Sequence, residues 1–361
     1  MSSPQLSSTE QVQQQDTGSP DSRKVPTSGG KTADHVVNFS NTAHVSKSRV
    51  SLRRGNLFGQ SPAKRKIPQT PHLQENVDPQ INLLIRKQWI LYSVTPLYKF
   101  SYNQLQEYSR QLSFFIAAEK QKRPAVEAEL DLGFTVKFSS ISTLKATGLD
   151  QPAVLIQIAQ RSRNAAEKAG GKVLWTGCFC CTCADDMLEA VMEDFTCLPL
   201  FLVKGSESLL TIVGTWFQQT FDCCFSRLTI SSMNLAWMAA MWTASKADSH
   251  TVATELTFSV PCSPYPLDIS YAIHPDDAKA FWDSIHTTQG EVHQEEVDLF
   301  MEMLYCHFHR HFKIYLSATR LVKVSTSVAA AHSDGKIKIL HTRYLIGVLS
   351  LLTELAISKI M

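Results

Sequence analysis

Residues 320–340 read RLVKVSTSVAAAHSDGKIKIL, and this stretch says most about the fold class. β-Branched residues are frequent in Arg320–Val328 and in Lys336–Leu340, and Ser333-Asp334-Gly335-Lys336 joins the two runs. An Asp-Gly step between two such runs is a strong signal for a β-hairpin. We therefore predict antiparallel pairing in this part of the chain.

The residues before and after this hairpin add both strands and helices, in an order that alternates only loosely. Strand-like runs occur at 89–94, 134–139, 154–159, 172–181, 195–203, 224–230, 251–260 and 267–273. Helical spacing of apolar residues occurs at 101–121, 206–221, 234–245, 294–308 and 344–357, and a further helix starts at His274-Pro275. This order predicts an α+β fold, with antiparallel or mixed β-sheets and helices packed beside them.

The chain divides by composition into a tail and a body. Residues 1–75 are rich in Ser, Thr, Gln, Pro and Gly, with ten Lys or Arg against five Asp or Glu. Such a segment cannot bury enough apolar surface to offset the entropy of ordering, so we predict a disordered basic tail. Residues 76–361 hold 25 basic and 28 acidic residues and form the predicted folded body, in which we consider two sub-lobes near 76–205 and 206–361.

The tail carries one candidate regulatory segment. Ser61-Pro62 stands before the basic cluster Lys64-Arg65-Lys66, and Thr70-Pro71 follows. The pattern is typical of a nuclear-import signal beside proline-directed phosphorylation sites at Ser61 and Thr70. The alternative is a solvated run of charges without a partner.

Several classes of protein find little support in the sequence. No apolar run follows Met1, and Tyr344–Ile357 is too short and too polar to span a membrane, so we expect an intracellular protein without a membrane anchor. The nine cysteines favour a reducing compartment over a disulfide framework. Glycine-rich phosphate-binding motifs and the G-x-S-x-G elbow do not occur. We expect neither enzymatic activity nor a cofactor.

Two clusters keep a metal-binding alternative open. Cys178–Cys183 contains two overlapping C-x-x-C spacings, and Cys306–His311 contains three alternating histidines. On a strand Cys178 and Cys180 would point away from Cys181, and on a helix successive histidines of His307–His311 would be about 200° apart. Burial of the thiols and a polar helix end therefore explain the two patterns better than zinc does.

The cations of the predicted hairpin form a candidate interface. Lys323, Lys336 and Lys338 can face solvent while the neighbouring apolar residues pack inward, and Arg320 begins the first strand. Such a strip could face the phosphates of a nucleic acid. The competing interpretation is a solvated sheet face, because lysine commonly protects exposed strands.

Long segments of the chain resemble the centromere protein L family of vertebrates. The resemblance covers residues 64–361, whereas residues 1–60 carry none. It rests on these five segments: Lys87–Ser101, Glu193–Leu202, Leu235–Thr243, Phe308–Ile314 and Thr319–Ser327.

The resemblance implies a non-enzymatic α+β scaffold subunit of the inner kinetochore, located in the nucleus at the centromere. It implies pairing with centromere protein N through the C-terminal sheet region. It also implies contacts with centromere protein C, with the H-I-K-M module, and with DNA at the centromere protein A nucleosome, in support of chromosome segregation in mitosis. Our own hypothesis is that the Arg320–Leu340 hairpin is the partner surface, with its basic face toward DNA.

Overall fold

The computed structural model describes the parts of the chain that carry its secondary structure. All of them belong to one compact unit, Ser46–Met361. The described residues are 64–66, 79–122, 133–148, 150–160, 171–182, 193–245, 252–262, 264–286 and 291–360. Apart from Lys64–Lys66, the predicted tail lies outside them.

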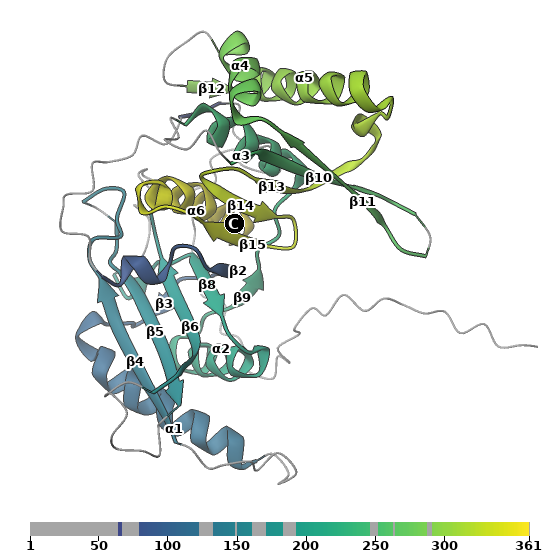
Figure 1. Cartoon of the computed structure of the whole chain (residues 1–361). Helices are drawn as coiled ribbons and strands as arrows, with labels where there is room; N and C mark the ends of the chain where they lie inside the picture. The colour runs from purple at the N-terminus through teal and green to yellow at the C-terminus, as the bar shows by residue number, and fades with distance from the viewer. Residues whose placement is uncertain are drawn as a thin grey trace, which may run out of the picture. The chain divides into compact units, whose positions relative to one another are not determined.

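One long antiparallel sheet organises the described residues (Figure 1). Along the sheet, the strands follow the order β11 (Leu267–Ile273), β10 (Thr254–Val260), β13 (Arg320–Ser325), β14 (Ala329–His332), β15 (Lys336–Ile339), β2 (Gln88–Val94), β8 (Leu200–Lys204), β6 (Val173–Cys180), β5 (Ala153–Gln160) and β4 (Phe134–Ile141). Strand β9 (Phe225–Arg227) also pairs with β2. Two short pairs lie outside this sheet: β1 (Lys64–Lys66) with β12 (Glu291–His293), and β3 (Leu97–Tyr98) with β7 (Phe195–Thr196).

Six α-helices pack beside the strands in the part of the chain that the structure describes, so the predicted α+β class is confirmed. They are α1 (Leu105–Gln121), α2 (Glu207–Phe221), α3 (Ser232–Ala244), α4 (Pro275–Ile285), α5 (Gln294–Phe312) and α6 (Leu345–Ile360). Their starts follow from local chemistry. Ser206 Oγ accepts from the Leu209 N–H and Ser231 Oγ from the Asn234 N–H, which satisfies amide groups that a first helical turn leaves unpaired. Pro275 occupies the first turn of α4, where its missing N–H costs nothing.

Two hydrophobic cores lie on opposite faces of the sheet. Successive side chains of a strand alternate between faces, and in β8 Leu200 and Leu202 enter one core while Phe201 and Val203 enter the other. Helices α1 and α2 belong to the core that contains Phe201. Helices α3, α4, α5 and α6 belong to the core that contains Leu202. The sub-lobe boundary considered near residue 205 falls between β8 and α2, which share a core.

The predicted hairpin contains one strand more than the sequence indicated. Arg320–Leu340 folds as three successive strands, β13, β14 and β15, instead of two. Thr326 makes the additional turn: its N–H donates to the Ala329 carbonyl at 3.0 Å, and its hydroxyl accepts from the Val328 N–H at 3.1 Å. The Ala329–Ala331 run has little β-propensity of its own, so pairing on both sides decides its conformation.

Candidate macromolecular interface

The four predicted interface cations lie on one face of the sheet. In the register of the strands, Lys323 is opposite His332, and His332 is opposite Lys336. Lys338 lies two residues along β15 from Lys336, and Arg320 lies opposite Ser259, away from the buried Leu321. The helices that pack against β13 and β2, α3 and α6, belong to the core on the other face. These cations therefore face away from that core.

The turn between β14 and β15 places an acidic residue among these cations. Gly335 has φ +80°, a conformation that glycine adopts without strain, and it brings Asp334 between two basic side chains. Asp334 carboxylate oxygens lie 2.5 Å from Lys336 Nζ and 2.7 Å from His332 Nδ1. Burial alone would raise the pKa of Asp334, but the hydrogen bond from Lys336 and the charge of His332 hold this pKa below its ordinary value.

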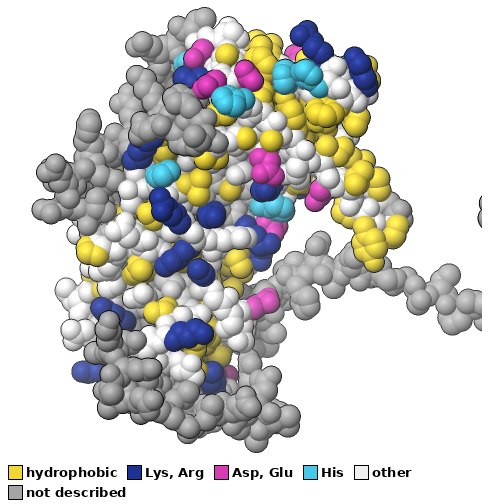
Figure 2. All heavy atoms as spheres, in the orientation of Figure 1, with side chains coloured by type: hydrophobic (Ala, Val, Ile, Leu, Met, Phe, Trp, Pro, Cys, Tyr) yellow, Lys and Arg dark blue, Asp and Glu magenta, His cyan; other side chains and the backbone are white. Residues whose placement is uncertain are grey.

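The remaining cations differ in how they are paired. Lys323 Nζ lies 3.0 Å from Glu255 Oε1 on β10. Arg227 of β9 donates from Nε to the Asp334 carbonyl at 3.0 Å. Within the described residues, no carboxylate lies at ion-pair distance from Arg320 or Lys338, and both are exposed. They are the cations of this face most open to a phosphate. In Figure 2, Lys and Arg side chains are spread over the middle of the view, around β15, β2 and β8.

The hairpin cannot offer a strand edge or an apolar surface to a partner. Strand β13 pairs with β10 and strand β15 pairs with β2, so both outer edges are occupied. Val324, Ile337 and Ile339 are buried in the core with α3 and α6. What the hairpin does present is its basic face.

A free strand edge lies elsewhere, at β11. Within the described residues β11 pairs only with β10, so its other edge leaves backbone groups open to a further strand. Tyr265 lies just before β11 and Leu267 is its first residue, and they have 80% and 57% of their surface exposed. A free edge beside exposed apolar side chains is a common arrangement for strand addition by another protein. A strand at 267–273 was predicted from its residues, but its place at the end of the sheet depends on contacts that no local pattern shows.

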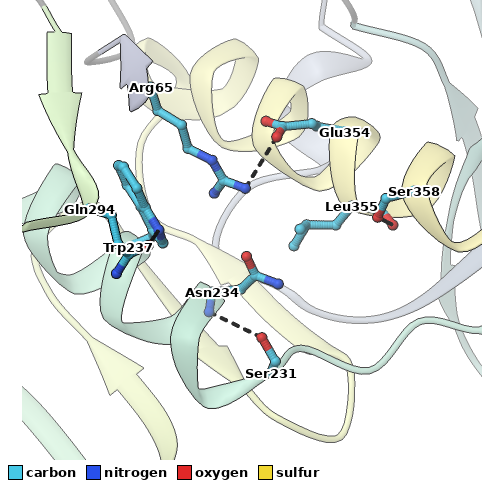
Figure 3. A network of polar contacts seen from close by, with 8 residues as sticks. All are labelled: Arg65, Ser231, Asn234, Trp237, Gln294, Glu354, Leu355 and Ser358. Atoms are coloured by element: carbon cyan, nitrogen blue, oxygen red, sulfur yellow. Dashed lines mark hydrogen bonds and ion pairs between the residues drawn. The ribbon is translucent and has the colours of Figure 1, made fainter. Parts of the chain in front are cut away.

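The predicted import cluster is held against the body. Lys64, Arg65 and Lys66 form β1, and Arg65 is only 8% exposed. Figure 3 shows Arg65 between Trp237 of α3 and Glu354 of α6, with an ion pair to the latter. Sequence analysis missed this site, because Arg65 is far in sequence from both residues. The predicted phosphorylation sites Ser61 and Thr70 lie outside the described residues.

The cysteine alternative finds no converging ligand set. Cys178 and Cys180 lie in the core with α6, Cys181 lies in the core with α1 and α2, and Cys183 is outside the described residues. Burial raises the pKa of the Cys178 thiol to about 12 and that of Cys180 well above its ordinary value, which disfavours the thiolate that zinc requires. Within the described parts of the chain, no three His, Cys, Asp or Glu side chains are placed to hold a metal ion.

The histidine cluster follows the helical register that its sequence predicts. Helix α5 continues to Phe312, so His307 and His311 are one turn apart, and their ring centroids are 4.7 Å from each other. His307 Nδ1 bonds the Tyr271 hydroxyl, and His309 stacks on Tyr315 at 4.0 Å. Burial and then the charge of His311 lower the pKa of His307. Aromatic packing at the end of α5 occupies these rings.

Comparison with known proteins identifies the family. The family model described as Centromere protein L matches residues 83–357. Centromere protein L of Homo sapiens is 59% identical over 336 residues, which cover 93% of this chain and 97% of that protein. The chain belongs to the centromere protein L family. Family members of Gallus gallus and Danio rerio are 60% and 42% identical, over 85% and 82% of this chain and 90% and 82% of their own lengths.

Membership of the centromere protein L family confirms several expectations. The chain is a centromere and kinetochore protein, and it is located in the nucleus. The family contributes a structural component of the kinetochore. Of the helices that the structure describes, none combines the length and apolar character needed to cross a membrane.

Proposed function

We propose that this chain is a scaffold subunit of the inner kinetochore that pairs with centromere protein N. In this role it helps to assemble kinetochore proteins on centromeric chromatin, and so supports mitotic progression and chromosome segregation. Membership of the centromere protein L family is the observation that carries the proposal. Centromere protein C, the H-I-K-M module and the centromere protein A nucleosome are the further partners that we propose.

The open edge of β11 is the best candidate for the pairing surface. Antiparallel strand addition would give a partner a row of backbone hydrogen bonds, and Tyr265 and Leu267 would add apolar contacts beside it. This proposal moves the protein contact from the Arg320–Leu340 hairpin, whose edges are already paired, to the end of the same sheet.

The test is pairing with purified centromere protein N, measured by size-exclusion chromatography and by calorimetric titration. We expect Leu267→Asp to weaken the complex roughly tenfold or more, because it places a charge in an apolar contact. The matched control is Phe114→Asp, which changes a side chain that is 75% exposed on α1, the helix that packs against β4 at the opposite end of the sheet from β11. If the Leu267 variant binds as tightly as the unaltered protein, β11 is not the surface that pairs with centromere protein N. Failure of the unaltered chain to bind would remove the pairing itself.

A second proposed contact joins the basic face of β13–β15 to DNA. Arg320 and Lys338 are exposed, and the side chains of Lys323 and Lys336 stay partly exposed despite their acidic neighbours. Because the body as a whole is faintly acidic, we expect this face to contribute within the assembled complex and not as an independent DNA binder.

A further inference from the structure

Strand β1 is attached to the body by backbone pairing and by charge. Its three residues pair antiparallel with β12, with Lys64 opposite His293, Arg65 opposite Val292 and Lys66 opposite Glu291. Lys64 Nζ also lies 2.9 Å from a Glu291 carboxylate oxygen, although both groups are largely exposed. An exposed ion pair of this kind stabilises little, so three residues of pairing cannot hold β1 firmly by themselves.

Arg65 supplies the specific part of the attachment. Its side chain is 6% exposed, and its Nη2 donates to Glu354 Oε1 at 3.1 Å. The guanidinium carbon lies 5.1 Å from the centroid of the Trp237 ring, within the range of a cation–π contact. Trp237 is in turn fixed by donating from Nε1 to Gln294 Oε1 at 2.7 Å. Figure 3 shows Asn234 and Leu355 pointing toward the same space between α3 and α6.

Burying the Arg65 side chain also costs free energy, which keeps the docking of β1 reversible. Arg65 Nε and Nη1 are buried and, within the described residues, have no hydrogen-bond partner. Burial lowers the pKa of Arg65, and the charge and hydrogen bond of Glu354 oppose that shift. A buried guanidinium with two unsatisfied donors gives up part of what the ion pair gains. The balance favours a strand that docks and detaches over one that is permanently part of the core.

We propose that β1, with Arg65 held between Trp237 and Glu354, is a reversible clasp that buries the central arginine of the basic cluster Lys64–Lys66 while Lys64 stays exposed. While the clasp is closed, the central arginine of the cluster cannot enter the acidic groove of a nuclear-import adapter. The cluster becomes readable only in the fraction of molecules in which β1 has left β12. This inference rests on the proposed import role of the cluster, and the clasp itself can be tested without that role.

The first measurement is the rate at which trypsin cleaves the full-length protein after residues 64, 65 and 66. Glu354→Gln removes the charge partner but keeps the shape of the side chain. Arg65→Lys keeps the charge of the cluster but loses the planar fork and its contact with Trp237. We expect both variants to be cleaved at these bonds roughly tenfold faster than the unaltered protein. Glu354→Gln loses the charge that pairs with Arg65, and Arg65→Lys loses the guanidinium that fits between Glu354 and Trp237. Glu302→Gln, an exposed acid on α5, is the matched control and should change nothing.

The second measurement is the affinity of the same proteins for a purified nuclear-import adapter. The apparent affinity for the adapter is proportional to the fraction of molecules in which β1 is detached. Variants that open the clasp should therefore bind the adapter more tightly, by a factor similar to the gain in cleavage rate. A synthetic peptide spanning residues 58–70 should bind more tightly than the unaltered protein. Equal cleavage rates in the unaltered protein and both variants would overturn the clasp. A peptide that does not bind the adapter would overturn the import role, while the cleavage ratio would still decide on the clasp.

Discussion

Strands β8 and β15 belong to the same sheet but differ in what covers them. Four successive residues of β8, Leu200–Val203, are buried because a core lies on each face. In β15 buried Ile337 and Ile339 alternate with Lys336 and Lys338, because one face is open. The difference shows how one sheet can be used in two ways: its doubly covered part buries apolar residues in two cores, and its singly covered part leaves charged side chains facing solvent.

The largest effect is expected on the doubly covered side. Phe201 is fully buried and stacks on Phe179 with ring centroids 4.0 Å apart. Phe201→Ala should lower the free energy of unfolding by about 3–5 kcal/mol, measured by urea denaturation, because it leaves a cavity among aromatic rings. Lys338→Ala on the open face should change it by less than about 0.5 kcal/mol. Similar losses in the two variants would contradict the comparison.

The next effect concerns the turn that shapes the open side. A methyl group on Gly335 would overlap the Leu228 carbonyl oxygen, and its φ of +80° is strained for other residues. Gly335→Ala should therefore cost about 2 kcal/mol or more in unfolding free energy. Gly133→Ala is the control, since a methyl group there meets nothing within 4 Å. A neutral Gly335 variant would mean that this turn does not hold β14 and β15 in register.

A functional prediction separates the two sides by charge. In the complex with centromere protein N, the double variant Lys336→Gln, Lys338→Gln should bind a short mixed-sequence DNA duplex roughly fivefold more weakly. The slope of log affinity against log salt concentration should also be smaller by about one to two, which corresponds to one to two fewer counterions released on binding. Both quantities are measured by fluorescence anisotropy. The control replaces Arg110 of α1 and Lys122, the residue that caps the C-terminal end of α1, in the same way. If both double variants lose DNA equally, the open face has no special role.

The smallest expected effect is a pH dependence from Asp334. Because its pKa is lower in the folded protein, its contribution to stability is present above the unfolded pKa of about 3.9 and is lost as pH falls through the folded value. The carboxylate is partly exposed, so solvent screening limits the contribution to less than about 1 kcal/mol. Asp334→Asn should be less stable than the unaltered protein at pH 7, with the gap in unfolding free energy narrowing as pH falls below the unfolded pKa of about 3.9 in urea denaturation. A constant gap would assign the loss to the turn instead.

Local patterns in the sequence predicted most elements, and non-local contacts account for what they missed. The stripe from Val297 to Phe308 gave α5, and Ser206 gave the start of α2. After Pro79, the spacing of Ile81, Leu84 and Ile85 is also typical of a short helix. The chain forms only a 3-10 turn at Ile81–Leu83 there, because β2 begins at Gln88 and takes the following residues into the sheet. Helical spacing over so few residues cannot outweigh pairing with β8 and β15.

In the candidate sites, too, local patterns predicted some features and non-local contacts decided the rest. Alternation along β15 was enough to place Lys336 and Lys338 on one face, since the period of a strand is local information. Arg320 and Lys323 are three residues apart and share that face only because β13 bulges between them, which alternation alone does not predict. The burial of Arg65 and the free edge of β11 depend on which distant segments meet. No spacing in the sequence could have paired Arg65 with Trp237 and Glu354.

The position of β2 has a consequence for how the chain is made. Lys336 of β15 lies opposite Ile90 of β2, so the two parts of the sheet are joined by residues from near the start and near the end of the folded body. During synthesis, the edge of β2 that pairs with β15 stays uncovered until most of the chain has left the ribosome. Pairing across such a separation is slow, and an uncovered strand edge invites aggregation. A chain that ends before residue 336 should therefore depend on chaperones, even though β2, β8, β6, β5 and β4 are already complete.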